Sequence, residues 1–227
     1  MSALNGLKVL DLSRVLAGPW CGQMLADLGA DVIKVESFDG DDTRGMGPPY
    51  IGEISAYFSC ANRNKRSICI DLHKAESREV IHTLVKQADV LIENFRTGTA
   101  ERLGVGYETL SAINPRLIYC SVSGYGRTGP EATRAGYDFA VQAEGGLMAI
   151  TGARDGTPNK VAVAVVDLAT GQNAVIAILA ALLQRQNSGH GQQVAVSLFD
   201  TQLTWLANIG AGVLFTGEDA PRYGNEH

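Results

Sequence analysis

The alternation of short apolar runs with segments of helical period constrains the fold of this chain more than any other feature. Between the apolar runs, helical patterns cover Trp20–Leu28 and Lys74–Gln87, and a short helix precedes Leu103. Strands that alternate with helices connect in parallel, so the pattern predicts an α/β fold: an open parallel sheet with helices on both faces. The apolar runs typical of buried strands are Lys8–Leu12, Val32–Val35, Ser67–Leu72, Val90–Glu93 and Arg116–Val122.

The last third of the chain continues with a long apolar helix expected at Leu168–Arg185, the turn NSGHGQ and a strand at Gln193–Ser197. A final helix is expected at Phe199–Phe215. No repeat or internal linker precedes about residue 216, and the polar ending GEDAPRYGNEH is typical of a linker. We therefore expect a large domain over residues 1–200, then a helix and the start of a linker over residues 201–227 toward a small domain absent from this chain.

Charge and cysteine content exclude several classes of function. The 227 residues carry a net charge of -5 and are 45% hydrophobic, which suits one globular domain and gives no overall attraction for nucleic acid or a membrane. The four cysteines are scattered without a CxxC pair, so we expect reduced thiols and no metal site. The first residues, MSALNGLKVLDLS, hold neither a signal peptide nor a membrane span, which favours a cytoplasmic location.

Familiar cofactor and hydrolase motifs are missing from the sequence. The segment after the first strand is SRVLAGPWCGQ, not the GxGxxG of dinucleotide-binding proteins, so a nicotinamide cofactor is disfavoured. No Walker loop and no GxSxG nucleophile elbow occur, and the four histidines stand in unrelated contexts.

Asp167 is the carboxylate that the sequence singles out. It stands in VAVAVVDLATG, directly after six apolar residues and before the apolar helix expected from Leu168. One interpretation is structural, because Asp is a favoured N-cap whose charge is stabilised at a helix amino end. The other is functional, because open α/β sheets place ligand chemistry at strand-to-helix junctions and a carboxylate can attack a thioester carbonyl. The residues alone leave both open.

A cluster of cations lies at Arg63, Lys65 and Arg66 inside NRNKRS, beside an expected strand. Phosphate groups would suit such a cluster. The alternative is a solvated surface, which is the commoner environment of Lys and Arg and which the residues alone favour slightly.

A long series of motifs, in order, resembles family III coenzyme A transferases of the CaiB/BaiF type, which include formyl-CoA transferase and succinyl-CoA-dependent dicarboxylate transferases. The resemblance covers about residues 6 to 200. It runs through GLKVLDLSRVLAGPWCGQMLADLGADVIKVE, GDDTRGMGPPY, NRNKRSICIDL, ADVLIENFRTG, INPRLIYCSVSGYGRTGP, RAGYD, DLATGQNAVIAILAAL and GQQVAVSLFD.

The resemblance implies a Rossmann-like, CoA-binding large domain with Asp167 as the catalytic nucleophile. Asp167 would attack an acyl-CoA to form an aspartyl anhydride and then an aspartyl-CoA thioester, which passes CoA to an acid acceptor. Coenzyme A or acyl-CoA would be a substrate rather than a permanently bound cofactor, the second substrate would be a small carboxylic acid, and the full-length protein would be an interlocked homodimer. The CoA-binding residues implied by the resemblance are Leu16, Ala17, Ile70, Asp71, Leu72, His73, Asn94, Phe95, Arg96, Arg102, Ala135, Tyr137 and Asp138; for Phe95, core packing is the alternative.

The chain departs from the family pattern at several positions. Some relatives carry cations where this chain has Ser37, His73 and Ala135, so Arg134 or Arg66 is expected to substitute as a phosphate ligand. In some relatives a glutamine stands at the position of Leu16, and that glutamine touches the acid substrate.

Two alternatives stand beside the transferase. The first is an alpha-methylacyl-CoA racemase of the same fold, whose catalytic histidine lies in an AGHD context; this chain has AGYD, and Tyr137 is a poor base at neutral pH. The second is a truncated CoA-binding fragment, in which Asp167 would be exposed to water and a mixed anhydride would hydrolyse.

Overall fold

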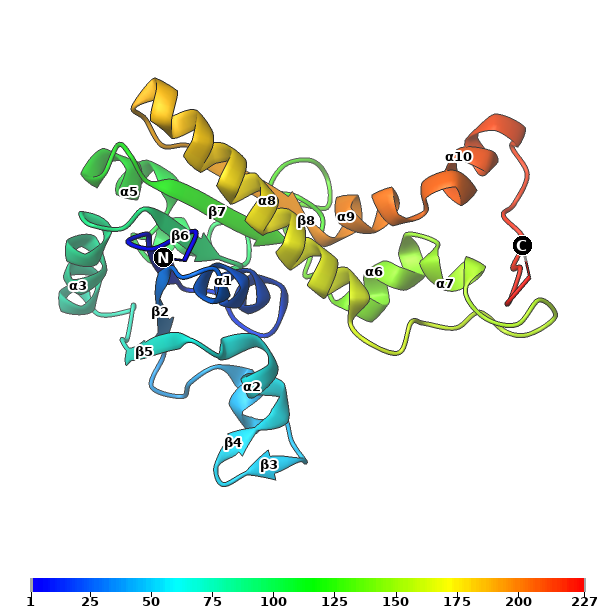
Figure 1. Cartoon of the computed structure of the whole chain (residues 1–227), viewed down its shortest axis with the longest axis horizontal. Helices are drawn as coiled ribbons and strands as arrows, with labels where there is room; N and C mark the ends of the chain where they lie inside the picture. The colour runs from blue at the N-terminus through cyan, green and yellow to red at the C-terminus, as the bar shows by residue number, and fades with distance from the viewer. Residues whose placement is uncertain (1, 227) are drawn as a thin grey trace.

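The computed structural model describes residues 2–226 and is built on a six-stranded sheet in which every pair of neighbouring strands is parallel. In space the strands follow the order β5-β2-β1-β6-β7-β8 (Figure 1). The chain therefore builds outward from β1 to one edge and then, from β6 onward, to the other. Such a reversal opens a crevice at the carboxyl ends of the two central strands, here β1 and β6. The strands are β1 (Lys8–Asp11), β2 (Asp31–Glu36), β5 (Lys65–Cys69), β6 (Val90–Glu93), β7 (Ile118–Ser123) and β8 (Gln193–Ser197).

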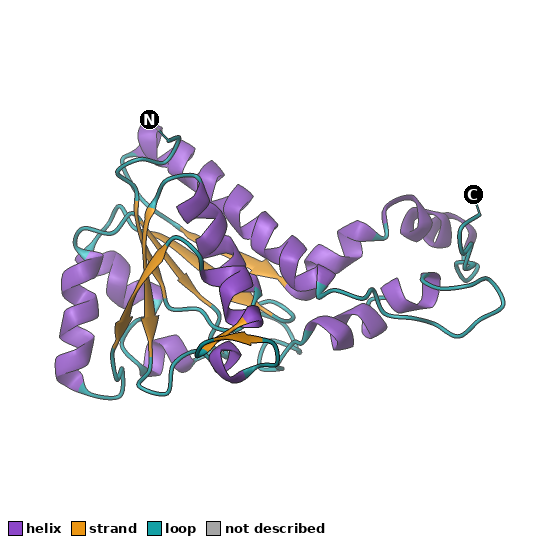
Figure 2. Ribbon diagram, turned by 60° about the horizontal axis from the view of Figure 1, so that its bottom comes forward, coloured by secondary structure: helices purple, strands orange, loops and turns teal. Residues whose placement is uncertain are grey.

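Helices cover both faces of the sheet (Figure 2). Each face has its own hydrophobic core. On one face α1 (Ala17–Asp27) packs against the long α8 (Val165–Ser188). On the other lie α3 (Ala75–Val85), the short α4 (Thr99–Arg102) and α5 (Tyr107–Ile113). Successive side chains of a strand point to opposite faces, so Val90 and Ile92 enter the first core while Leu91 enters the second. Although α8 is long and apolar enough to cross a membrane, five of its eight buried residues belong to the first core.

Two groups of elements extend beyond the sheet. One contains the 3₁₀ helix η1 (Asp42–Gly45), the hairpin of β3 (Tyr50–Ile51) and β4 (Ile54–Ser55), and α2 (Ala56–Asn62). The other contains α6 (Asp138–Glu144), α7 (Leu147–Ile150), α9 (Leu198–Trp205) and α10 (Ala207–Thr216), which reach away from the sheet at one side (Figures 1 and 2). Helix α10 has no buried residue, and Phe215 near its end is 92% exposed.

The structure confirms the predicted α/β class, with a parallel sheet and helices on both faces. The third sheet strand lies at Lys65–Cys69, two to three residues earlier than the expected Ser67–Leu72. The prediction of a single helix at Phe199–Phe215 is wrong. The helix is interrupted at Leu206, between α9 and α10, and the first residue of α10, Ala207, has a φ of 44°. The predicted domain boundary at residue 200 falls inside α9, and the division into domains stays a prediction.

Candidate active site

Two neighbouring cavities of about 250 Å³ each lie at the carboxyl ends of the central strands. Arg14, which follows β1, and Phe95, which follows β6, line both of them. The two cavities are therefore adjacent, with these two side chains between them. The crevice expected from the strand order is thus open and consists of two adjacent cavities.

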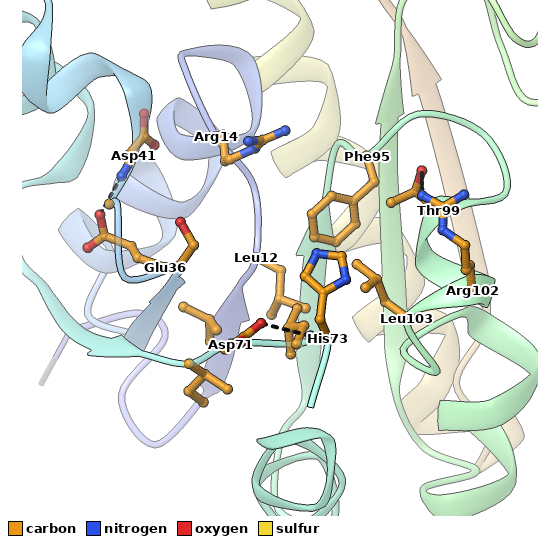
Figure 3. Close-up of a pocket in the computed structure, with 15 residues that line it drawn as sticks. Leu12, Arg14, Glu36, Asp41, Asp71, His73, Phe95, Thr99, Arg102 and Leu103 are labelled. Atoms are coloured by element: carbon orange, nitrogen blue, oxygen red, sulfur yellow. Dashed lines mark hydrogen bonds between the residues drawn. The ribbon is translucent and has the colours of Figure 1, made fainter. Parts of the chain in front are cut away.

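The first cavity is largely apolar, with cations at its margin (Figure 3). Its apolar wall contains Leu12, Val35, Ile70, Leu72, Phe95 and Leu103. Arg102 is exposed and donates only to the Thr99 hydroxyl, at 3.2 Å, among the partners found for it in residues 2–226. The Arg14 guanidinium approaches Asp42 only at 4.0 Å. Both cations are therefore available to an anion, while the wall suits an aromatic or aliphatic group.

The second cavity contains the Asp167 carboxylate together with polar and cationic side chains. Leu16 and Ala17 line it from the start of α1, Asn94 and Arg96 from the segment after β6, and Tyr137 from the loop before α6. Arg127 and Arg134 add two further cations. This cavity therefore combines a carboxylate with groups that can hold an anionic substrate.

The predicted site residues divide between the two cavities. Ile70, Asp71, Leu72, His73, Phe95 and Arg102 line the first, whereas Leu16, Ala17, Asn94, Phe95, Arg96, Ala135, Tyr137 and Asp167 line the second. Asp138 lines neither cavity and is 8% exposed. The structure thus brings together almost all of the positions that the sequence indicated, and their roles in binding stay predictions. Phe95 is half-buried, and it both packs on the second core and lines the cavities.

Asp167 is not the N-cap of its helix, so that interpretation of the sequence is wrong. Helix α8 begins at Val165, its N-cap is Ala164, and Asp167 is the third helical residue. No strand precedes α8 either, because the six apolar residues form a loop and the first helical turn. Burial, and then the negative charge of Asp138, raises the pKa of the Asp167 carboxyl from 3.8 to about 7.

Asp138 performs the capping that the sequence assigned to Asp167. One oxygen of its carboxylate accepts hydrogen bonds from the amides of Val166 at 2.7 Å and Asp167 at 3.1 Å. The other accepts from Gln142 Nε2, and Gln142 Oε1 accepts from the Val161 amide at 2.8 Å. A buried polar chain therefore fixes the segment that carries Asp167. It also directs the free amides of the helix end to Asp138, which leaves the Asp167 carboxylate without them.

The structure changes the interpretation of the cations. Lys65 forms a buried ion pair with Asp11 at 2.8 Å, and Arg66 pairs with Asp31 away from both cavities. Arg63 pairs with Asp27. Lys65 is thus buried, whereas Arg63 and Arg66 lie on the solvated surface, as the second interpretation held. Arg66 lines neither cavity and is not placed to substitute for the missing family cations.

Arg134 does line the second cavity, where it is paired with Glu131 and Glu144 and lies over the Tyr125 ring at 4.6 Å. Arg127 is held by Glu93 at 2.7 Å and donates to the Phe95 carbonyl at 2.6 Å. These contacts fix where the two positive charges stand.

Sequence reasoning missed several residues at the site. Arg14 lies three residues beyond the end of β1, and this position near the carboxyl end of a strand could have indicated it. Two glycines, Gly124 and Gly136, lie back to back beside the second cavity, and a Cβ added at Gly136 would lie 2.3 Å from the Gly124 Cα. Only glycine allows this approach, which seats Tyr137 beside the cavity. No local pattern predicts this contact between two residues at opposite ends of the loop that joins β7 to α6.

The expectation that Asp167 would be open to water is only partly met, because its side chain is half-buried in the described chain. Burial raises the pKa of the Tyr57 hydroxyl, on α2, and the nearby Asp167 charge raises it further. No group of three or more His, Cys, Asp or Glu side chains within residues 2–226 could hold a metal ion.

This arrangement defines an α/β protein with a ligand crevice at the strand reversal and a carboxylate of perturbed pKa, which is typical of an enzyme active site. Comparison with known families narrows the class. The model of CoA-transferase family III matches residues 4–227, and the chain belongs to that family.

Individual relatives agree with this assignment. The succinate–glutarate CoA-transferase of Agrobacterium fabrum is 50% identical over 99% of this chain and 58% of its own length. The human succinyl-CoA:glutarate CoA-transferase is 45% identical over 99% of this chain and 51% of its own length. A crystal structure of a CAIB/BAIF family protein from Brucella suis matches the whole chain, and 61% of its own, with a TM-score of 0.97 and 53% identity. The chain thus spans about half to three-fifths of the length of these relatives.

Proposed function

We propose that the protein carrying this chain transfers coenzyme A from an acyl-CoA donor to a small carboxylic acid, with Asp167 as the nucleophile. The single observation that carries the proposal is the position of Asp167, half-buried in the second cavity with its pKa raised to about 7. A carboxyl with this pKa is about half ionised at neutral pH, and it is poorly hydrated. Both properties suit a carboxylate that must attack a carbonyl carbon.

The two-part cavity suits the shape of acyl-CoA. The apolar wall of the first cavity can receive an adenine ring, and Arg14 and Arg102 can pair with phosphates. The chain of the ligand would then pass Phe95 into the second cavity, where the thioester meets Asp167.

The proposed reaction conserves charge at each step and needs no proton transfer. The Asp167 carboxylate attacks the thioester carbonyl, the carbon–sulfur bond breaks, and CoA leaves as a thiolate. The thiolate then attacks the aspartyl carbonyl of the anhydride, which releases the donor acid and forms aspartyl-CoA. The acceptor carboxylate attacks this thioester and again expels the thiolate. Attack of the thiolate on the acceptor acyl group finally gives the new acyl-CoA and restores Asp167.

A dicarboxylic acid is the acceptor that we favour. Names of several relatives refer to glutarate, mesaconate or oxalate. In this chain Arg96 lines the cavity that contains Asp167, so Arg96 could hold one carboxylate while the other reacts.

The test is a transfer assay with a panel of acyl-CoA donors and carboxylic acids, in which the CoA esters are separated by chromatography. Wild-type protein should form the new ester, and Asp167→Ala should abolish this. Asp155→Ala, which removes an exposed carboxylate, should not. An acceptor labelled with ¹⁸O in its carboxylate should leave label in Asp167, and hydroxylamine should trap Asp167 as a hydroxamate visible by mass spectrometry. Modification at another residue would refute the assignment of the nucleophile.

The same assay run in deuterated water separates this proposal from racemisation. A racemase would exchange the alpha hydrogen of the acyl group without needing an acceptor acid, whereas the transferase would not. Tyr137, which stands where the racemases carry a histidine, is 62% exposed in the loop before α6.

We also propose that the whole protein is a homodimer. The support is helix α10, whose large apolar side chains Leu214 and Phe215 are 89% and 92% exposed. An apolar surface of this kind usually marks an interface. Light scattering after size exclusion should give twice the subunit mass, and a monomer at micromolar concentration would contradict the proposal.

A further inference from the structure

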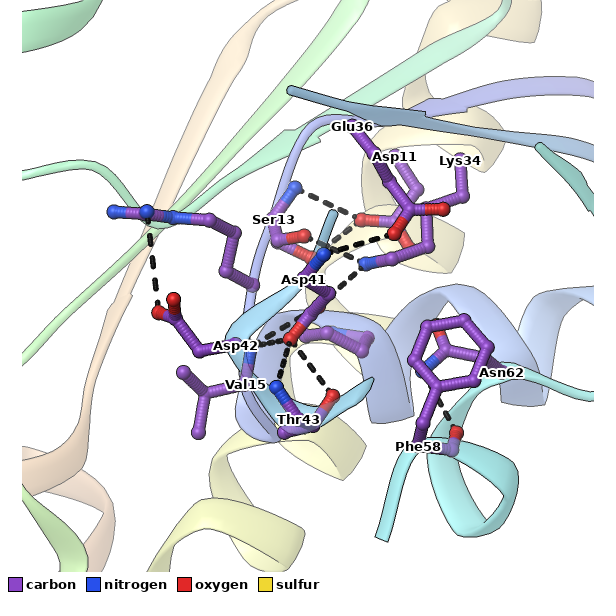
Figure 4. A network of polar contacts seen from close by, with 12 residues as sticks. Asp11, Ser13, Val15, Lys34, Glu36, Asp41, Asp42, Thr43, Phe58 and Asn62 are labelled. Atoms are coloured by element: carbon purple, nitrogen blue, oxygen red, sulfur yellow. Dashed lines mark hydrogen bonds and ion pairs between the residues drawn. The ribbon is translucent and has the colours of Figure 1, made fainter. Parts of the chain in front are cut away.

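The turn after β1, residues Ser13–Val15, is held by side chains from other segments (Figure 4). The Ser13 amide donates to Asp11 at 3.0 Å, and its carbonyl accepts from Lys34 Nζ at 2.9 Å. The Arg14 amide donates to Asn94 Oδ1 at 2.8 Å, and the Arg14 carbonyl accepts from Asn94 Nδ2 at 2.7 Å. The backbone of the turn therefore depends on three side chains for four of its hydrogen bonds.

Val15 is the strained residue of this turn. Its φ is 69°, in the left-handed region that a β-branched side chain rarely adopts. The Val15 amide donates to both carboxylate oxygens of Asp41, each at 3.3 Å. Asp41 is itself fixed, because its Oδ1 also accepts from the amide and hydroxyl of Thr43 at 3.0 and 2.7 Å. The contact with Asp41 thus restrains a conformation that Val15 alone would avoid.

Lys34 and Asp41 form an ion pair at 2.8 Å, and their side chains are only 1% and 0% exposed. Removing two charges from water costs free energy that their attraction often fails to recover, so a buried pair of this kind is weak support for stability. Between them the two residues hold the Ser13 carbonyl and the Val15 amide. These two contacts indicate that the pair fixes the turn.

The turn leads directly into the wall of the site. Arg14 lines both cavities, and Leu16 and Ala17 line the second one together with Asp167. The start of α1 is seated on the turn, because a Cβ added at Gly18 would lie 2.3 Å from the Ser13 Cβ. A shift of the turn would consequently move the wall that faces Asp167.

We propose that Lys34 and Asp41 are positioning residues: they hold the strained Ser13–Val15 turn so that Leu16 and Ala17 keep their places in the cavity that Asp167 also lines. Neither residue forms a covalent bond with substrate in this scheme. The kinetic part of the test rests on the proposed function, because it requires CoA transfer by the wild-type protein.

The test compares Lys34→Met and Asp41→Asn with Arg185→Met. Arg185 pairs with Asp89 at 2.8 Å next to the amino end of β6, and this pair is also largely removed from water, so it controls for general loss of stability. We expect the two turn variants to lose at least about tenfold in kcat per folded molecule, since a displacement of about 1 Å can cost a hundredfold. KM for acyl-CoA should change by a smaller factor than kcat, because Arg14 and Asp41 are two of the 15 residues that line the first cavity. Arg185→Met should lower Tm and leave kcat within about twofold.

A rescue variant distinguishes positioning from general damage. Asparagine adopts the left-handed conformation more readily than valine, so Val15→Asn should restore most of the kcat lost in Asp41→Asn. A double variant no more active than Asp41→Asn would overturn the proposal. So would turn variants whose kcat per folded molecule equals that of wild type or falls only as much as that of Arg185→Met.

Hydrogen exchange separates the failure of this inference from the failure of the proposed function. If wild-type protein transfers no CoA, the proposed function fails, and the amides of residues 13–17 still test the clamp. Faster exchange of these amides in Asp41→Asn than in Arg185→Met supports the restraint of the turn. Equal exchange in the two variants refutes it.

Discussion

Replacing Asp167 with asparagine should make the protein inactive and, above neutral pH, more stable. The substitution keeps the size of the side chain and removes the charge. In the folded protein, burial and then the Asp138 charge raise the pKa of the Asp167 carboxyl from 3.8 to about 7. The folded state therefore binds a proton that the unfolded state has already lost over the range between these values.

The sign and size of the effect follow from this difference. Because the folded pKa lies above the unfolded one, the free energy of unfolding falls as pH rises from about 4 to about 7, and it is constant above that range. The whole difference corresponds to roughly 4 kcal/mol, of which about 2.5 kcal/mol should appear between pH 5 and pH 8. Asp167→Asn carries no such term. Its advantage over wild type should consequently grow by about 2.5 kcal/mol between these two pH values.

Urea unfolding of wild type and Asp167→Asn at pH 5 and pH 8 measures this quantity directly. Taking the difference between the two proteins cancels the titration of every other group that the substitution leaves unchanged. Asp155→Asn serves as the control, because that carboxylate is exposed and should show no such growth. If the advantage of Asp167→Asn is the same at both pH values, the pKa of Asp167 is not raised in the folded protein, and the reasoning above is refuted.

Three further substitutions test the surroundings of the nucleophile. Asp138→Asn removes a negative charge that raises the Asp167 pKa. The acid limb of the plot of kcat against pH, expected near pH 7, should therefore move to lower pH. An unchanged midpoint would contradict an effect of the Asp138 charge on Asp167. Gly136→Ala places a Cβ against the Gly124 backbone and should cost about 1 to 3 kcal/mol in unfolding free energy, measured by urea titration. Wild-type stability would show that the two ends of this loop can separate. Arg102→Ala should weaken CoA binding by calorimetry about tenfold and reduce its salt dependence; unaltered affinity would remove Arg102 from the phosphate site.

Much of the sheet could be predicted because parallel strands buried on both faces appear as continuous apolar runs. The predicted bounds Val90–Glu93 and Gln193–Ser197 agree with β6 and β8. β5 was placed too late because it begins with Lys65 and Arg66, whose charges are neutralised by Asp11 and Asp31 from distant positions in the sequence. A local pattern cannot show such partners.

The site was predictable to the extent that its residues follow strands. Asn94 and Phe95 come directly after β6, and Leu16 lies a few residues beyond β1, so the strand order alone brings them together. The surroundings of Asp167 were not predictable. Its helix is capped by Asp138, 29 residues earlier in the chain, and this contact exists only once α6 and α8 have packed. The pKa of Asp167 depends on the same packing.

The turn of Ser13–Val15 has a consequence for how this chain can change during evolution. Its hydrogen bonds come from Asp11, Lys34, Asp41 and Asn94, which stand on separate segments of the chain. Loss of one partner leaves a buried charge or backbone group unsatisfied, so single substitutions should be removed by selection. Lys34 and Asp41 should therefore be inherited as a pair among relatives, and lineages that lose one should also have replaced the other or acquired a glycine or asparagine at position 15.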